Sequence, residues 1–153
     1  GDLVELRRGL ADSQAQLIFL AAEADQARTV RPYLNNQIPV FATSQVNDGK
    51  NDALVNGDLN GVRFVDMPWL VQPDHAAVMV YPRLAGLSTE LQRFYALGID
   101  SCRIADELLS GQQTISLDGV TGKISYRGGS ALLREPVQAV FRDGVGVSLE
   151  SAK

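Results

Sequence analysis

The side chains that most often carry out catalysis are scarce in this sequence of 153 residues. It contains one histidine, His75, and one cysteine, Cys102. A serine nucleophile would have to use His75 as its base, and no Gly-x-Ser-x-Gly segment is present to expose a serine on a sharp turn. Asp74 is adjacent to His75, but neighbouring side chains point in different directions, so we expect a surface or helix-start histidine. We predict that no residue of this chain is catalytic.

The same counts limit metal chemistry. One cysteine and one histidine exclude a zinc finger, a disulfide framework and any Cys-plus-His multi-ligand site. Cys102 falls on the apolar side of a predicted helix, where burial raises the pKa of a thiol and makes it inert. The Asn- and Asp-rich segment 47–60 lacks the calcium-loop register with a glutamate at position 12, so it is interpreted as a solvated loop of turns. We expect no metal and no cofactor.

Two glycine motifs are interpreted as turns. In Gly119-Val-Thr-Gly-Lys123, Leu117 stands where a phosphate-binding loop needs its first glycine, and no helix follows to receive a phosphate. Gly144-Val-Gly146 lacks the third glycine and the helix of a dinucleotide fingerprint.

The charge balance argues against a nucleic-acid partner. Fourteen basic and 18 acidic residues give a net charge of −4, and no basic stripe is present to neutralise phosphates. The longest clearly apolar run, 17–22, is far short of the roughly 20 residues that span a bilayer. The sequence opens with Gly-Asp rather than methionine and a basic leader, so we interpret it as an excised or mature segment with any lipid anchor upstream.

Length and composition predict one globular domain or part of a larger one, with 45% hydrophobic and 21% charged residues. Apolar periodicity predicts helices over residues 2–11, 24–34 (kinked by Pro32), 74–81 and 89–110. It predicts strands over 17–22, 38–43 and 62–67, and short C-terminal strands over 114–117, 122–126, 137–141 and 145–149. Residues 44–61 are predicted to be a polar loop with at most one turn of helix near 53–55. The run 17–22 is typical of a strand buried on both faces. Helices and strands alternate with short connections, which implies an α/β fold with a parallel sheet and right-handed crossovers.

Two features of these elements suggest function. Trp69 follows strand 62–67 between Pro68 and Pro73, which predicts that it packs in the core or at a hinge, with a partner contact less favoured. Gly98 inside helix 89–110 suggests close backbone packing at that turn. The apolar side of this helix is formed by Leu91, Phe94, Tyr95, Gly98, Ile99, Cys102, Ala105, Leu108 and Leu109.

Three segments resemble a known family: Val62-Arg-Phe-Val-Asp-Met-Pro-Trp-Leu70, Phe94-Tyr-Ala-Leu-Gly-Ile-Asp-Ser-Cys-Arg-Ile-Ala105 and Gly119-Val-Thr-Gly-Lys-Ile-Ser-Tyr126. Together they resemble the LppC/LpoA family of bacterial lipoproteins over nearly the whole chain. The helix and hairpin motifs are shared with type I periplasmic binding proteins, and Asp66-Met-Pro-Trp69 is what favours the lipoproteins.

The resemblance implies a type I periplasmic-binding-protein-like fold, with residues 1–153 forming a single partial domain of a two-lobed one. It implies that 2–67 and the C-terminal strands are second-lobe-like and that 74–110 is a helical first-lobe-like segment. Asp66 and Trp69 are the candidate hinge or partner-contact residues. The chain matches about the last half of the family's C-terminal domain, and Cys102, in mid-helix, is not the lipid-bearing cysteine.

The resemblance also implies function. Family members are outer-membrane lipoproteins that face the periplasm and activate a class A penicillin-binding protein in peptidoglycan synthesis, as regulators and not enzymes. The alternative is a periplasmic solute-binding protein for an amino acid or similar small ligand, with Ser44, Asp66 and Tyr95 as conceivable anchors near strand ends. A hydrolase is improbable without the motifs above.

Helix 89–110 carries a further expectation, because the first-lobe strands that would cover it are absent from the sequence. Exposing so many large apolar side chains is costly. We expect the helix to fold back on the second-lobe elements or to bury this side against another copy of the chain, and we favour self-association.

Overall fold

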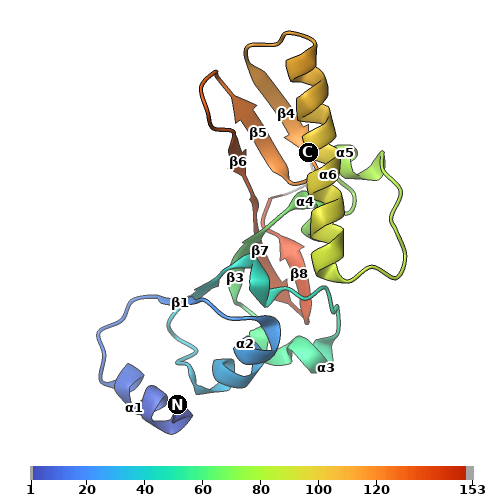
Figure 1. The fold of residues 1–153 in the computed structure, drawn as a ribbon. Coiled ribbons are helices and arrows are strands. Elements are labelled where there is room, and N and C mark those ends of the chain that lie inside the picture. Colours follow the sequence, from blue (N-terminus) through green and yellow to red (C-terminus); the bar gives the residue numbers. More distant parts are fainter. Residues whose placement is uncertain (1, 151–153) are drawn as a thin grey trace. The chain divides into compact units, whose positions relative to one another are not determined.

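The computed structural model describes residues 2–150 and divides the chain into two compact units (Figure 1). Among the described residues, unit 1 comprises 2–65 and 138–149, and unit 2 comprises 66–137 and 150. The chain passes from unit 1 to unit 2 after residue 65 and returns to unit 1 after residue 137, and each of these boundaries lies inside a strand.

Unit 1 is built on a sheet of order β1-β2-β3-β7-β8. Its strands are β1 (Ile18–Leu20), β2 (Val40–Ala42), β3 (Arg63–Asp66), β7 (Val137–Arg142) and β8 (Val145–Ser148). The pairs β1–β2 and β2–β3 are parallel, which confirms the expected parallel sheet, and β7–β8 is an antiparallel hairpin.

Short helices join these strands. They are α1 (Leu3–Ala11), α2 (Ala24–Val30), α3 (Ala53–Asn56) and the 3₁₀ turns η1 (Arg31–Tyr33), η2 (Ser44–Val46) and η3 (Gly57–Leu59). Pro32 lies in η1, so the expected kink takes the form of a change from α-helix to 3₁₀ turn. The predicted loop 44–61 is more ordered than expected, since it contains η2, α3 and η3.

The sheet of unit 1 buries one face along β1–β3. Val40, Ala42 and Phe64 are at most 5% exposed, and Phe64 packs on Phe141 with ring centroids 4.9 Å apart. The opposite face carries Phe19, which is 64% exposed. The prediction that 17–22 is buried on both faces is therefore wrong, because no described element covers this second face.

Unit 2 combines helices with a second sheet. Its elements are α4 (Pro68–Val71), α5 (Ala76–Met79), α6 (Thr89–Leu109), β4 (Ile115–Gly119), β5 (Gly122–Tyr126) and β6 (Leu133–Glu135). The sheet is antiparallel with order β4-β5-β6, and α6 and α5 contact β4. Strands β4 and β5 thus lie in one compact unit with the helical segment, and residues 138–149 lie with the sheet of unit 1. The expected assignment of these segments to lobes stays a prediction.

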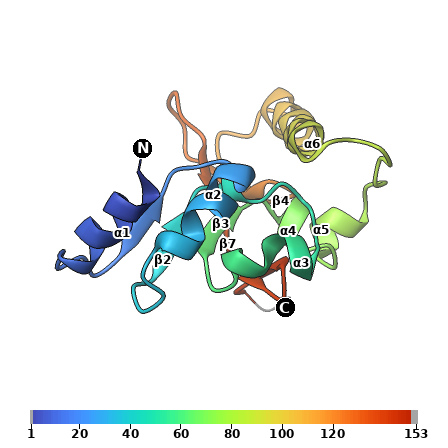
Figure 2. The same cartoon turned by 90° about the horizontal axis from the view of Figure 1, so that it is seen from below.

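Helix α6 begins and ends close to the predicted residues. The Ser88 hydroxyl caps its N-terminus by accepting from the Leu91 amide, and Gly111 follows its C-terminus at φ +83°. Figure 2 views this helix nearly along its axis.

The buried side of α6 differs from the predicted one. Ala96, Asp100 and Ile104 are buried, whereas Cys102 is exposed, so the expectation of a buried thiol is wrong. The cause is Asp100, whose buried hydrogen bonds fix which side of the helix faces the hairpin. Gly98 corrects a second expectation, since a Cβ there would meet nothing within 4 Å and no close packing requires the glycine.

Candidate functional site

The two residues that the sequence singles out, Asp66 and Trp69, lie in one short stretch that we call the crossover segment, Asp66–Leu70. It directly follows the point where the chain leaves unit 1 and belongs to unit 2. The crossover segment contains the end of β3 and the start of α4, a one-turn helix that the sequence does not predict. Pro68 occupies the first turn of α4, where a missing N–H costs nothing.

Asp66 is held by α6. Its side chain is 1% exposed, its Oδ2 accepts from Arg93 Nη2 at 2.9 Å, and its Oδ1 accepts from the Met67 amide at 2.9 Å. A buried carboxylate with a guanidinium partner is stable as a pair, but removing either partner leaves an uncompensated buried charge. The pair therefore fixes the start of the crossover segment on the helix.

Trp69 is 1% exposed and packs in the core of unit 2 with Val78, Ala96 and Val120. Its ring meets Tyr95 edge-on at 5.5 Å, and the Arg83 guanidinium lies 4.0 Å from the ring centroid. This is the core packing that the sequence favours for Trp69. Its role as a hinge or partner contact, like that of Asp66, stays a prediction.

Arg83 also fixes the backbone of the crossover segment. Its Nη1 donates to the Trp69 carbonyl at 2.6 Å, and the Trp69 amide donates to the Val120 carbonyl at 2.9 Å. Burial lowers the pKa of Arg83 from its ordinary value, because the charged form loses hydration. The cation remains charged at any physiological pH and contributes a cation–π contact.

The hairpin that receives Trp69 is fixed in turn by Asp100. This carboxylate is fully buried and accepts from Val120 N at 3.1 Å, Thr121 N at 2.8 Å and Thr121 Oγ1 at 2.7 Å. A Cβ on Gly119 would lie 2.6 Å from Asp100 Oδ2, so only glycine fits there. Sequence reasoning missed Asp100, because α6 also contains Glu90, Asp106 and Glu107 and no local pattern marks one of these acids as buried.

The remaining sequence candidates have structural positions. His75 caps α5, with Nδ1 accepting from Ala77 N at 3.3 Å and Nε2 lying 3.4 Å from Asp118 Oδ2, which confirms a helix-start histidine. Gly119–Lys123 joins β4 and β5 and Gly144 lies between β7 and β8, so both glycine motifs are turns, as predicted. Of the conceivable ligand anchors, Ser44 begins η2 in unit 1, while Asp66 and Tyr95 are engaged within unit 2 by the contacts above.

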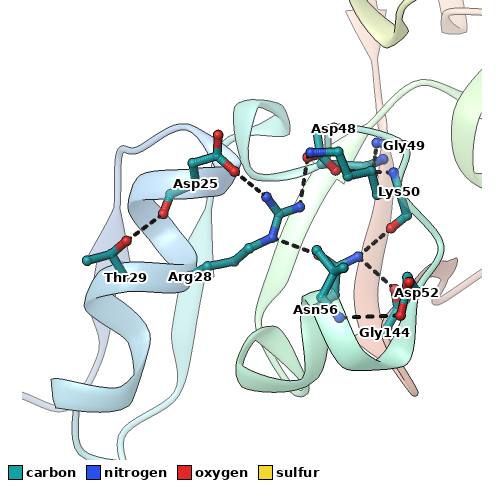
Figure 3. A network of polar contacts seen from close by, with 11 residues as sticks. Asp25, Arg28, Thr29, Asp48, Gly49, Lys50, Asp52, Asn56 and Gly144 are labelled. Atoms are coloured by element: carbon teal, nitrogen blue, oxygen red, sulfur yellow. Dashed lines mark hydrogen bonds and ion pairs between the residues drawn. The ribbon is translucent and has the colours of Figure 1, made fainter.

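Unit 1 contains a separate polar network around Arg28 (Figure 3). Arg28 donates to Asp25 Oδ1 at 2.6 Å, Asp48 Oδ2 at 2.7 Å and Asn56 Oδ1 at 3.0 Å, and Asn56 donates to the Gly144 carbonyl at 2.9 Å. These bonds connect α2, the segment 47–60 and the β7–β8 turn.

The network holds segment 47–60 in place through Asn56, which is only 1% exposed, while most residues of the segment are exposed, so it is solvated as expected. The turn interpretation is confirmed by Asn47 and Asp48, whose side chains accept from Gly49 N and Lys50 N. Burial would raise the pKa of Asp48, but hydrogen bonds from Arg28 and Lys50 outweigh it and hold the pKa below its ordinary value.

Within residues 2–150, no group of three or more His, Cys, Asp or Glu side chains is placed to hold a metal ion. The polar groups around the crossover segment form structural hydrogen bonds and ion pairs, whereas the buried Trp69 Nε1 has no hydrogen-bond partner among the described residues. The side chains of this region have a structural role: they hold the crossover segment on α6 and on the β4–β5 hairpin.

Comparison with known proteins identifies the scaffold. A Glaesserella parasuis protein named "Penicillin-binding protein activator LpoA" is 23% identical over 94% of this chain and 26% of its own length. The LpoA C-domain from Haemophilus influenzae, described as a regulator of PBP1A, superposes with a TM-score of 0.74 at 18% identity, over 97% of this chain and 49% of that one. A Chromobacterium violaceum structure named "putative branched-chain amino acid ABC transporter" superposes with a TM-score of 0.75 at 37% identity, over 92% of this chain and 46% of that one.

The fold is thus the periplasmic-binding-protein-like α/β fold that the sequence predicts. The chain spans about a quarter of the length of the curated relative and about half of each solved chain. No helix among the described residues is long and apolar enough to cross a membrane. A family model described as "LppC putative lipoprotein" matches residues 7–144, and the chain therefore belongs to the LppC lipoprotein family.

Proposed function

We propose that this chain is a non-enzymatic regulatory module that binds and activates a class A penicillin-binding protein in peptidoglycan synthesis. The observation that carries the proposal is the family match over residues 7–144, together with curated relatives named as penicillin-binding protein activators. The buried polar groups are consistent with it, because Asp66, Asp100 and Arg28 stabilise the fold and are bound to protein groups.

The proposal includes a location. The family is one of lipoproteins, so we propose that the chain faces the periplasm and that its parent polypeptide is lipid-anchored in the outer membrane. Cys102 lies in α6 and is not placed to carry that anchor. The acidic net charge of −4 fits a protein partner and not a nucleic acid.

The test uses the purified chain and a purified class A penicillin-binding protein from the same bacterium. Biolayer interferometry measures binding, and the rate of glycan polymerisation and crosslinking from lipid II measures activation. We expect saturable binding and a faster rate on adding the chain. Absence of both effects at tens of micromolar, with circular dichroism showing a folded chain, would contradict the proposal.

A second candidate function is solute binding, which is favoured by the 37% identity to the Chromobacterium violaceum protein. Its test is a thermal-shift screen with branched-chain and other amino acids. A ligand at 100 times its Kd stabilises a protein by about 2.7 kcal/mol. For a chain of this size that raises the Tm by about 5–10 °C. A flat response across the panel supports the regulatory module, and a saturable shift supports the solute-binding protein.

A further inference from the structure

Part of the cover of Trp69 comes from a short stretch of unit 2, residues 75–83, which we call the cover segment. It contains α5, whose Val78 is 1% exposed and packs in one core cluster with Trp69. Arg83 ends the segment, with its guanidinium 4.0 Å from the Trp69 ring centroid and its Nη1 2.6 Å from the Trp69 carbonyl oxygen. His75 begins the segment as the N-cap of α5. Two different side chains therefore hold the two ends of this cover.

His75 holds its end of the cover segment through both ring nitrogens. Nδ1 accepts from the Ala77 amide at 3.3 Å, and Nε2 lies 3.4 Å from Asp118 Oδ2 on β4. A backbone amide can only donate, so the bond from Ala77 requires a lone pair on Nδ1 and places the proton of the neutral ring on Nε2. In an imidazolium both ring nitrogens carry protons and both donate. Protonation therefore sets two N–H groups against each other and removes the cap of α5.

The charged groups around His75 hold a protonated ring only weakly. Asp118 faces it from β4, but the Asp118 side chain is 61% exposed, and ion pairs of such exposed carboxylates contribute little. From α6, Arg103 pairs with Asp100 and also donates to the Asp118 carbonyl at 3.1 Å, which brings a second positive charge to the same residue. Asp74, which precedes His75, is exposed, and α4 contributes no charged side chain. Water therefore competes for the imidazolium.

Helix α5 depends on its cap because it is a single turn. It consists of Ala76–Met79, and the amides of Val78 and Met79 both donate to the His75 carbonyl, at 2.9 and 3.0 Å. A helix this short is not stable by itself, since few further hydrogen bonds follow its costly first turn. Loss of the cap therefore frays the turn that carries Val78, and with it the contact between Val78 and Trp69.

The Arg83 end of the cover segment does not respond to pH in the same way. A guanidinium stays charged at any physiological pH, so Arg83 keeps its contacts with the Trp69 ring and carbonyl. The segment can therefore open at its His75 end while it remains attached at the other end.

The closed arrangement has a cost that favours opening. Trp69 Nε1 is buried, and no group among the described residues accepts its hydrogen. An N–H group that is buried without an acceptor has lost its hydration without compensation. Access of water to the indole therefore stabilises the open arrangement relative to the closed one.

We propose that His75 is a pH-sensitive switch whose protonation uncaps α5, shifts the cover segment towards an open state and gives water access to the Trp69 indole. Histidine is the side chain that ordinarily changes charge between about pH 5 and 8, so the segment is closed at the upper end of this range and opens towards the lower end. His75 is the single histidine and Trp69 the single tryptophan, so the switch and its reporter are each unique in the chain. This switch does not depend on the proposed function.

Trp69 fluorescence across pH tests the switch, and circular dichroism checks the fold at each pH. From about pH 8 to about pH 5 we expect the emission to move to longer wavelength and the acrylamide quenching constant to rise at least about twofold, because the indole gains contact with water. Nitrogen NMR of the His75 ring should find the proton of the neutral form on Nε2. The Ala77 amide signal should shift with the same midpoint as the ring, since the two groups share one hydrogen bond.

His75→Asn separates the cap from its titration, because asparagine caps a helix without changing charge in this range. We expect this variant to keep the fluorescence of the closed state at both pH values. The matched control is Asp118→Asn, which removes the exposed ion pair but leaves the cap, so the transition should persist.

Four results would overturn the proposal. They are a constant Trp69 emission and quenching while the His75 ring titrates, a neutral ring with its proton on Nδ1, an unchanged transition in His75→Asn, and loss of the transition in Asp118→Asn. The first two are measured on the unmodified chain, so the proposal remains testable even if a variant does not fold.

Discussion

Asp100 is the single residue on which the structure of unit 2 depends most directly. Its carboxylate accepts three hydrogen bonds from the Val120–Thr121 turn, and it is fully buried. The same turn offers its Val120 carbonyl to Trp69, so a defect at Asp100 would reach the crossover segment.

We expect Asp100→Ala to lower the free energy of unfolding by about 3–5 kcal/mol, because two buried amides and a hydroxyl lose their acceptor and Arg103 loses its ion-pair partner. The matched variant Thr121→Val removes only the hydroxyl bond and should cost about 1–2 kcal/mol. Urea unfolding followed by circular dichroism measures both. Equal losses for the two variants would show that the amide bonds to Asp100 contribute little.

His75 and Cys102 provide the residue-level test of a non-enzymatic function. We expect His75→Ala and Cys102→Ser to retain full activation of a penicillin-binding protein. His75→Ala should cost about 0.5–2 kcal/mol of stability, because α5 loses its cap. The lipid II assay measures activation, and a thermal melt separates any loss of fold. Loss of activity in a folded variant would assign that side chain a chemical role.

At the scale of elements, the Arg28 network joins α2 to the segment 47–60. We expect Asp48→Asn to lower the free energy of unfolding at neutral pH by about 1–2 kcal/mol, since it weakens charge-assisted bonds from Arg28 and Lys50. The pKa of Asp48 is lowered in the folded state. Its contribution is therefore complete above the unfolded pKa of about 3.9 and is lost as pH falls towards the folded pKa.

The Asp48→Asn variant and the wild type should thus converge in stability below about pH 4, as measured by urea unfolding across pH. The control is Asp25→Asn, which loses an ion pair on a carboxylate that is 89% exposed. This substitution should cost less than about 1 kcal/mol at neutral pH. A constant difference between wild type and Asp48→Asn at all pH values would contradict the assigned cause.

The sequence predicts the elements better than their environments. Helix 89–110 and strand 122–126 are correct almost to the residue, because periodicity and capping are local signals. The prediction of which side of α6 faces the core is wrong, because hydrophobicity alone cannot show that Asp100 is buried by hydrogen bonds to a turn 20 residues away. Trp69 could be singled out from the prolines around it, and Asp66 from the resemblance of residues 66–69 to the lipoprotein family. Arg93 and Arg83, which hold them, come from positions that no local pattern connects.

The same reasoning explains β1. A run of apolar residues indicates burial on both faces only if the chain supplies two layers of cover. Ile18 and Leu20 are half-buried, whereas Phe19 between them faces outward beside Phe41 and Arg63. Arg63 lies 5.8 Å from the Phe41 ring centroid, which gives this side of the sheet a cation–π contact instead of a packed layer.

At the scale of the whole molecule, each of the two units has apolar side chains that no described element covers. The chain spans about half of the solved chains that share its fold, so the same fold elsewhere contains about as much polypeptide again. Phe19 in unit 1 and Phe94 in unit 2 are the most exposed aromatic side chains of these surfaces, at 64% and 68%.

We expect the native chain to bind the dye ANS, and we expect Phe19→Thr and Phe94→Ser each to reduce its fluorescence. Because the two residues lie in separate units, the reductions should add in the double variant. Neither change should lower the free energy of unfolding by more than about 1 kcal/mol, since neither side chain is buried. If the ANS fluorescence of the double variant were no lower than that of either single variant, the expected additivity would be contradicted.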